Sequence, residues 1–298
     1  MVARGTFFCF GLGFSGKVIA RQLKDAGWTV GGTCREAETV RHLSAEGISA
    51  HLFDGDNPLE RSEEIFRNVT HLLISVPPAP RQGDPVLHCH AGDLGNFKML
   101  EWVGYLSTTG VYGDTQGRMV DETAELVPSS ERSQRRLKAE QDWLNRFNRD
   151  GLPVHVYRLS GIYGPGRSAL DTVQAGKARQ IVKPGHKFSR IHVNDIATAI
   201  RASINRPNPG AVYNLCDNEA APPADVTAFA CKLLGIEPPP EVSFEDASVD
   251  MSEMALSFWN DNRLIDNSRI KNELKVELAY PTYREGLRAI LAAETGQT

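Results

Sequence analysis

The stretch from Phe7 to Leu23, FFCFGLGFSGKVIARQL, places three glycines between an apolar run and an amphipathic segment. Gly11, Gly13 and Gly16 have the spacing of a turn that leads from a β-strand into an α-helix and accepts a pyrophosphate. Gly11 would allow the tight turn, Gly13 the approach of the phosphates, and Gly16 the close packing of helix on strand. The helix N-terminus would add unpaired N–H groups and the positive end of its dipole. The residues of this turn that we expect to contact a dinucleotide are Gly11, Gly13, Phe14, Ser15 and Gly16.

Short apolar runs alternate with helical patterns through the first half of the chain, as in βα units built around a parallel sheet. The expected strands are residues 6–10, 29–33, 49–53, 71–76, 102–107 and 154–159. The expected helices are residues 15–25, 36–46, 58–67 and 130–149. HLLISV and VHVYRL are apolar almost throughout, which is typical of strands covered on both faces. We therefore predict the α/β class with a Rossmann-type doubly wound parallel sheet.

Prolines and glycines become frequent after about residue 160, in the stretches GIYGPGRS, NRPNPG, EAAPPAD and GIEPPPE. We interpret residues 1–160 as a dinucleotide-binding domain, with later strands contributed from about residues 186–217. Residues 161–298 would form a smaller α/β region on the substrate side, interleaved with the last strands of the sheet.

Composition excludes several classes of partner. The 298-residue chain has a formal net charge of −4, which gives no electrostatic reason to expect nucleic acid or an anionic membrane. No apolar run approaches the roughly 18 residues of a membrane-spanning helix. Five scattered cysteines without a CxxC favour reduced thiols in the cytoplasm. His88, Cys89 and His90 have no further ligands at zinc-like spacing, so we predict no metal site.

The end of the second expected strand, VGGTCRE, indicates which dinucleotide is bound. Folds that prefer NAD place Asp or Glu there to bind the ribose 2′-hydroxyl, whereas this chain has Thr33 and Arg35. A guanidinium offers a fork that matches a 2′-phosphate, so we expect NADP, with NAD as the less favoured alternative. Glu36 follows Arg35 and could pair with it, which keeps the alternative open.

The ends of the next two strands complete the expected cofactor site. Asp54 lies in HLFDGD, where its carboxylate could accept a hydrogen bond from the adenine amino group or could serve as a plain turn residue. The cofactor-binding residues that we predict beyond the glycine turn are Thr33, Arg35, Asp54, Ser75 and Pro77.

Nearly the whole length of the chain carries characteristic motifs: GLGFSG, YLSTTGVYGD, YRLSGIYGPG, FSRIHVNDIATAI, VYNLCD and YPTYREGL. Together they resemble the short-chain dehydrogenase/reductase superfamily in its extended or atypical, NAD-dependent epimerase/dehydratase-like form. VGGTCRE is similar to the NADP-selecting turn of that family's reductases. The resemblance implies a small-molecule substrate of carbonyl or sugar type, and a homodimer formed through paired helices.

In that family a Ser or Thr after the fifth strand and a Tyr-x-x-x-Lys pair on the next helix perform the chemistry. The tyrosine exchanges the substrate proton, the lysine lowers the pKa of the tyrosine, and the Ser or Thr orients the carbonyl. The resemblance places Thr108 in the Ser/Thr position, with Ser107 and Thr109 beside it. Tyr112 and Tyr163 match family tyrosines that pack rather than react.

The segment SERSQRRLKAEQDWL, residues 130–144, lacks the tyrosine in either of two possible registers. One register sets Gln134 and Lys138 in the Tyr and Lys positions, and the other sets Arg132 and Arg136 there. At about 100° per residue, the two arginines adjoin the apolar side of the helix, and the glutamine and lysine lie nearly opposite. A helix buries its apolar side, so we expect the arginine register, with an exposed Lys138.

Arginine cannot replace tyrosine as a proton shuttle, because it remains protonated throughout the physiological range. It can hold a carboxylate, a phosphate or a ribose hydroxyl, although both arginines could instead lie on a solvated helix start.

The resemblance gives further expectations for the second half of the chain. Asp195 in HVNDIATAI would cap the helix that follows it, and His192 would pack. Arg167, Ser168 and Arg190 border loops where family members bind substrate, and the charges of Arg190 and of the two helix arginines would suit an anionic one.

Two functions remain open. The first is a cytoplasmic NADP-dependent oxidoreductase, epimerase or dehydratase, whose acid is a water, Thr108 or a tyrosine elsewhere in the chain. The second is a non-catalytic dinucleotide-binding protein, such as a redox sensor or a regulatory protein. The missing tyrosine favours the second, whereas the Ser-Thr-Thr segment and the full second region favour the enzyme. The catalytic residues that we predict are Ser107, Thr108, Arg132 and Arg136.

Overall fold

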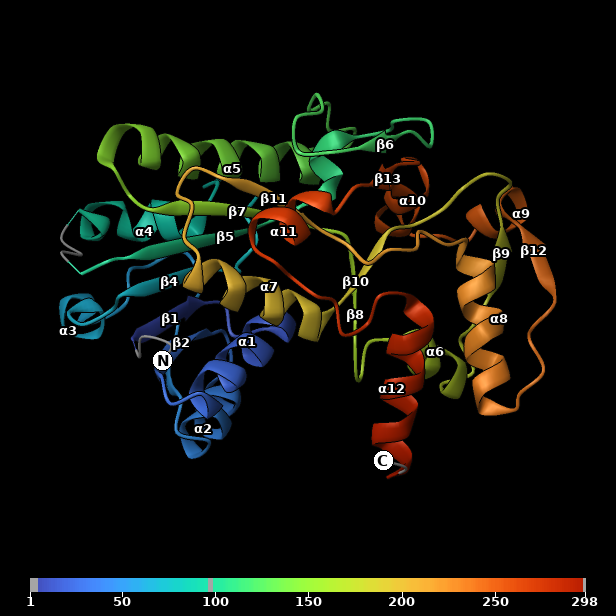
Figure 1. Ribbon diagram of the computed structural model, residues 1–298, viewed down its shortest axis with the longest axis horizontal. Helices are drawn as coiled ribbons and strands as arrows, with labels where there is room; N and C mark the ends of the chain where they lie inside the picture. Colours follow the sequence, from blue (N-terminus) through green and yellow to red (C-terminus); the bar gives the residue numbers. More distant parts are fainter. Residues whose placement is uncertain (1–4, 96–98, 297–298) are drawn as a thin grey trace. The chain divides into compact units, whose positions relative to one another are not determined.

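The computed structural model describes residues 5–95 and 99–296, and its central feature is a seven-stranded parallel sheet (Figure 1). The strand order is β11-β7-β5-β4-β1-β2-β3. These strands are β1 (Thr6–Phe10), β2 (Thr29–Cys34), β3 (Ser49–Leu52), β4 (His71–Ile74), β5 (Trp102–Thr108), β7 (Val154–Leu159) and β11 (Val212–Leu215). The order runs outward from β1 in both directions, as in a doubly wound sheet, so the predicted fold class is confirmed.

Helices cover both faces of this sheet (Figure 1). One face carries α4 (Pro85–Leu94) and α5 (Glu131–Asp150). The other face carries α1 (Phe14–Asp25), α2 (Ala37–Ala45) and α7 (Val193–Asn205). A buried core under α4 and α5 joins Phe10 of β1, Tyr105 of β5 and Trp143 of α5. Burial of each such side chain contributes about 1.5–3 kcal/mol to folding, which fixes α5 against the end of β5.

Most expected strands and helices differ from the observed ones by no more than two residues at an end, and larger differences occur at two places. The helix expected at 58–67 forms only at α3 (Ser62–Phe66), because Arg61 has a left-handed φ of +57° that a continuous α-helix cannot include. The helix α4 was not expected. Its signal is Asp84, whose carboxylate accepts from the N–H groups of Val86 and Leu87, followed by a proline at the first helical position.

The chain divides into two compact units, each assembled from three stretches. Unit 1 comprises Met1–Thr108, Glu131–Arg158 and Ile196–Tyr213, and it holds most of the large sheet. Unit 2 comprises Thr109–Ser130, Leu159–Asp195 and Asn214–Thr298. No helix in the described ranges is both long and apolar enough to cross a membrane.

In its described residues, unit 2 contains short parallel strand pairs and six α-helices. The pairs are β8 (Gly161–Tyr163) with β10 (Arg190–His192), β9 (Gln180–Val182) with β12 (Glu241–Ser243), and β6 (Met119–Val120) with β13 (Leu264–Ile265). The helices are α6 (Ala169–Gln174), α8 (Pro223–Leu234), α9 (Phe244–Ser248), α10 (Glu253–Trp259), α11 (Ser268–Glu273) and α12 (Tyr283–Thr295). The helices α6, α8 and α12 share a buried core that includes Leu170, Ala230 and Leu287.

Candidate active site

The glycine turn joins β1 to α1 in a conformation that requires glycine at its first position. Gly11 has a φ of +98°, and a Cβ there would lie 3.0 Å from the backbone nitrogen of Val76. The N–H of Gly11 donates a hydrogen bond of 3.0 Å to the hydroxyl oxygen of Thr33 on β2. Thr33 is buried, so its observed contribution is to support the turn from the neighbouring strand.

The other two glycines differ sharply in their surroundings. A Cβ at Gly13 would meet no heavy atom within 4 Å, so the space in front of α1 is open. A Cβ at Gly16 would lie 2.3 Å from the carbonyl oxygen of Gly11, because the helix packs directly on the turn. No side chain caps α1, and its first turn carries no acidic residue. These features fit the pyrophosphate of a dinucleotide, which needs an unobstructed backbone and an uncompensated helix N-terminus.

The other residues predicted for this part of the site lie around the same turn. Ser15 is buried, and Phe14 is partly buried beside it. The N–H groups of Ser75 and Val76 donate to the carbonyl oxygen of Phe10 at 2.8 and 3.1 Å. These bonds bring the segment after β4, which includes Pro77, next to the glycine turn.

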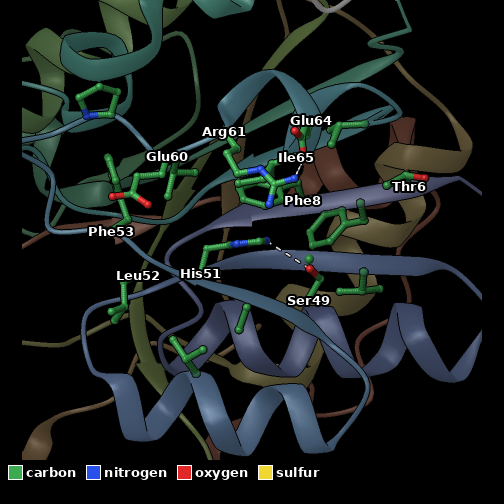
Figure 2. Close-up of a pocket in the computed structure, with 18 of the residues that line it drawn as sticks. Thr6, Phe8, Ser49, His51, Leu52, Phe53, Glu60, Arg61, Glu64 and Ile65 are labelled. Atoms are coloured by element: carbon green, nitrogen blue, oxygen red, sulfur yellow. Dashed lines mark hydrogen bonds and ion pairs between the residues drawn. The ribbon is translucent and has the colours of Figure 1, made fainter.

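Arg35 and Asp54 line a pocket of about 1200 Å³ in unit 1, and the turn glycines do not line it (Figure 2). The pocket lies between the sheet and the α3 segment. Residues on its two sides in Figure 2 are Phe8, Ser49 and His51 of the sheet, and Arg61, Glu64 and Ile65 opposite them. Arg35 is exposed at the end of β2, where it is accessible to a ligand.

The carboxylate of Asp54 accepts hydrogen bonds from the backbone of its own turn. Its Oδ1 accepts hydrogen bonds from the N–H groups of Asp56 and Asn57 at 2.8 and 3.0 Å. These hydrogen bonds lower the pKa of Asp54 below its usual value, and the bond from Asn57 has the largest effect. The observed role is therefore that of a turn residue, the second of the two interpretations, and adenine recognition stays a prediction.

The last two residues of β5 have different surroundings. The hydroxyl of Ser107 is buried and donates a hydrogen bond of 2.7 Å to Oε2 of Glu140 on α5. Thr108 is partly exposed, and because side chains alternate along a strand it lies on the opposite face of the sheet. Beyond it, the turn η1 (Thr109–Tyr112) holds the buried Tyr112, whose hydroxyl donates to Asn214. Of the three Ser/Thr residues, Thr108 is thus the one left with access to solvent.

The two registers of α5 place different residues beside β5. Arg136 donates to the carbonyl oxygen of Leu106 at 2.9 Å and to the hydroxyl of Tyr105 at 3.3 Å. Lys138 is 72 % exposed and pairs with Asp142 on the surface of the same helix. Arg136, and not Lys138, therefore lies beside β5, as expected from the register that sets Arg132 and Arg136 in the Tyr and Lys positions.

Arg132 lies differently from the expectation. We expected it at the edge of the inward face of α5, but it is exposed. The buried face of the helix begins only further along, with Ala139 and Glu140, so the first turn of α5 lies beyond the part that packs on the sheet.

These placements predict unequal effects of two substitutions on one helix. Lys138→Ala should change the free energy of unfolding by no more than about 0.5 kcal/mol, because the residue is on the surface. Arg136→Ala should weaken dinucleotide or substrate binding by about 1.5–3 kcal/mol, the usual contribution of a charged hydrogen bond. Calorimetric titration of both proteins checks this, and equal effects of the two changes would contradict it.

The sequence reasoning missed a buried ion pair behind Ser107. Glu140 and Arg158 of β7 are 1 % and 3 % exposed, and their Oε1 and Nη2 atoms are 2.6 Å apart. The sequence feature that could have indicated this pair is the arginine in the largely apolar strand VHVYRL, because a buried charge needs a partner. It predicts an acid on the helix that covers β7.

One expectation for unit 2 is wrong. Asp195 does not cap α7, because the helix already begins at Val193. Its carboxylate instead accepts from the N–H groups of Ala279 and Tyr280 at 2.8 and 3.0 Å, which fixes the loop before α12. His192 packs, as expected, with its ring 3.9 Å from that of Tyr280.

The order of the sheet and the open glycine turn before α1 are those of the Rossmann-type fold of short-chain dehydrogenases/reductases. The predicted resemblance is confirmed by comparison with known sequences. The chain belongs to the NAD dependent epimerase/dehydratase family, whose sequence pattern matches residues 93–216. The expectation of an NAD(P)-dependent enzyme of the epimerase/dehydratase kind agrees with this membership.

Three known proteins illustrate the similarity. Protein YeeZ of Escherichia coli K12 is 31 % identical over 281 residues, which cover 91 % of this chain and 94 % of YeeZ. A functionally unknown conserved protein from Silicibacter pomeroyi DSS is 46 % identical, with a TM-score of 0.89 over 97 % of this chain and 99 % of that one. A dTDP-glucose 4,6-dehydratase from Bacillus anthracis, solved in complex with NAD, has a TM-score of 0.79 over 99 % and 98 % of the two chains. At 19 % identity, that enzyme shows a common fold alone.

Proposed function

We propose that this protein is an NADP(H)-dependent oxidoreductase, epimerase or dehydratase that acts on a small carbonyl or sugar-type compound. The observation that carries the proposal is the glycine turn, with open space at Gly13 and a helix N-terminus without a side-chain cap. Gly11, Gly13 and Gly16 would hold the pyrophosphate, and the segment from Ser75 to Pro77 would lie along the bound cofactor. Calorimetric titration with NADPH and NADH tests this, and no saturable binding of either would refute it.

The choice of NADP rests on Arg35. Its guanidinium is exposed directly after β2, and no carboxylate precedes it on that strand. The NAD found in the Bacillus anthracis dehydratase favours the other dinucleotide, so the preference needs its own measurement.

Arg35→Ala should weaken NADPH binding by about 1.5–3 kcal/mol, because a charged hydrogen bond to the 2′-phosphate is lost. NADH affinity should stay nearly unchanged, since NADH carries no such phosphate. Titrations of both cofactors into the wild-type and variant proteins check this prediction. Equal losses for the two cofactors would assign Arg35 another role.

For catalysis we propose Thr108 as the group of unit 1 that contacts the substrate. The bound dinucleotide would accept or donate a hydride. The hydroxyl of Thr108 would donate a hydrogen bond to the substrate oxygen, and Arg136, on the α5 side of β5, would hold the end of that strand through its bond to the carbonyl oxygen of Leu106. Tyr105 is unsuited as the acid, because it is fully buried and burial raises the pKa of its phenol above the usual value. A water would therefore carry the substrate proton.

The second candidate function is a dinucleotide-binding sensor, which is favoured by the absence of a catalytic tyrosine from α5. That helix carries no tyrosine, and Ser107 is engaged by Glu140, so a dinucleotide-binding sensor without turnover has support of its own. Spectroscopic assays of NADPH oxidation and NAD(P) reduction against panels of carbonyl compounds and nucleotide sugars distinguish the two. Turnover that Thr108→Val removes while dinucleotide affinity persists supports the enzyme. Binding without turnover across the panel supports the sensor.

We also propose that the protein works in the cytoplasm, as a homodimer. Support for the compartment comes from the cysteines, all five of which are free thiols. The dimer rests on the family resemblance, and light scattering coupled to gel filtration tests it.

A further inference from the structure

The helix α10 of unit 2 carries large apolar side chains on its solvent side. Met254 and Phe258 are 63 % and 54 % exposed, and residues four positions apart lie on the same face of a helix. Val249, in the segment that leads from α9 into α10, is 82 % exposed. We call Val249, Met254 and Phe258 the α10 surface.

The opposite side of α10 is already packed. Trp259 is buried, and its ring lies 5.2, 5.3 and 5.4 Å from the rings of Phe244, Phe188 and His186. These contacts fix the orientation of the helix, so Met254 and Phe258 cannot turn inward unless Trp259 leaves its neighbours. Apolar side chains held in water in this way are typical of a surface that contacts a partner.

The surroundings of the α10 surface are acidic. Residues 233–262 contain seven Asp and Glu residues and neither Lys nor Arg. Four of these acids belong to α9, to α10 or to the segment between them, and all four are exposed: Glu245, Asp246, Asp250 and Glu253. Within the described parts of the chain, none of the four forms an ion pair.

One cation contacts these helices, and it does so on the packed side. The ammonium of Lys183 donates to the carbonyl oxygen of Trp259 at 2.6 Å and lies 4.3 Å from the centre of the Phe244 ring. Lys183 is half-buried, and its hydrogen bond is to backbone rather than to any of the four exposed carboxylates. Their negative charge is therefore available to a partner.

This combination of apolar and acidic groups indicates the chemistry of the partner. Negative charge disfavours nucleic acid, anionic lipid and acidic protein surfaces. A helix with apolar side chains on one face and Lys or Arg beside them complements both features, because it covers the apolar groups and neutralises the carboxylates. Methionine suits such a surface, since its unbranched side chain adapts to the shape of what it contacts.

We propose that the α10 surface is a docking site for a basic amphipathic helix of another protein. The apolar face of that helix covers Val249, Met254 and Phe258, and its Lys and Arg side chains pair with the four exposed carboxylates. All of these residues belong to unit 2, and none is predicted to bind the dinucleotide or to react. The docking site therefore does not depend on the proposed function.

The test is a titration of the full chain with a synthetic peptide of Leu and Lys at helical spacing, monitored by calorimetry at low and at high salt. A peptide with Glu in place of every Lys is the comparison. We expect saturable one-to-one binding of the Leu/Lys peptide, which added salt weakens because exposed charges are screened. Absence of saturable binding, or equal binding of the Leu/Glu peptide, would refute the site.

Substitutions of apolar residues locate the binding. The double variant Met254→Gln with Phe258→Gln should bind the Leu/Lys peptide at least about tenfold more weakly, because a few large side chains carry most of the binding energy of an interface. Leu52→Gln is the matched control, since Leu52 is 55 % exposed on β3 of unit 1. Circular dichroism checks that each variant is folded.

Substitutions of acidic residues test the charge. Asp250→Asn with Glu253→Gln should weaken peptide binding several-fold and reduce its dependence on salt, because two of the paired charges are removed. Glu63→Gln with Glu101→Gln makes the same change of charge at exposed residues of unit 1 and should leave binding nearly unchanged.

Two outcomes contradict the proposal. Equal losses for Leu52→Gln and for the double variant of Met254 and Phe258 would show that the peptide adheres to apolar surface in general. A homodimer that Phe258→Gln dissociates, measured by light scattering of the protein alone, would show that a second copy of the chain covers the α10 surface. An oligomeric state that Phe258→Gln leaves unchanged supports a separate partner.

Discussion

A Gly13→Val protein will fold and will show no saturable binding of either dinucleotide. The added side chain enters the open space in front of α1, where a Cβ meets no protein atom within 4 Å, and it fills the volume that a pyrophosphate needs. Gly13 has a φ of −85°, which valine adopts readily, so the fold should lose no more than about 1 kcal/mol. Calorimetry checks the loss of dinucleotide binding, and thermal unfolding checks that the fold is kept.

Two other glycines provide controls for this change. Gly92 in α4 also has no heavy atom within 4 Å of an added Cβ, so Gly92→Val should preserve both folding and dinucleotide affinity. Gly16→Ala should destabilise the protein by about 1–3 kcal/mol, because its Cβ would overlap the carbonyl oxygen of Gly11. Unchanged NADPH affinity in a folded Gly13→Val protein would show that the glycine turn is not part of the cofactor site.

Breaking the buried ion pair should produce the largest loss of stability. Glu140→Ala leaves the guanidinium of Arg158 without its partner in the core and removes the acceptor of Ser107. The free energy of unfolding should fall by about 3–5 kcal/mol, which is typical of an uncompensated buried charge. Urea denaturation monitored by circular dichroism measures this change.

The double variant Glu140→Leu with Arg158→Met separates charge from packing. Replacing both ions by apolar side chains of similar size should recover most of the loss, since neither charge is then stranded. The exposed pair of Lys138 and Asp142 on the same helix is the comparison, where Lys138→Ala should have little effect. A loss below about 1 kcal/mol for Glu140→Ala would mean that the burial of Arg158 is incomplete.

Features encoded locally were predictable from the sequence. The strands β1 and β7 begin and end at the expected residues, because apolar runs bounded by turn residues are visible in the chain itself. The glycine turn was also predictable, because the spacing of its three glycines determines the geometry of the turn. The exposure of Lys138 followed from helical periodicity alone.

Features that depend on distant partners were not predictable in this way. Glu140 and Arg158 reach each other only after α5 has packed against β7, so neither residue alone indicates the pair. Asp195 looked like a helix cap, but the N–H groups that donate to its carboxylate lie on a loop more than eighty residues further along, at Ala279 and Tyr280. Ser107 and Thr108 are neighbours in the sequence, and only the strand geometry separates their surroundings.

The hydrogen bond between Thr33 and Gly11 has a consequence for attempts to change the preferred dinucleotide. The hydroxyl of Thr33 holds the loop at the end of β1, whereas Arg35, which we propose selects the dinucleotide, is exposed. Support of the turn and the proposed selection of the dinucleotide thus lie two positions apart on one segment of chain. If Arg35 selects the dinucleotide as proposed, substitutions at Arg35 and its neighbour Glu36 should change the preference without disturbing the loop, provided that Thr33 is kept.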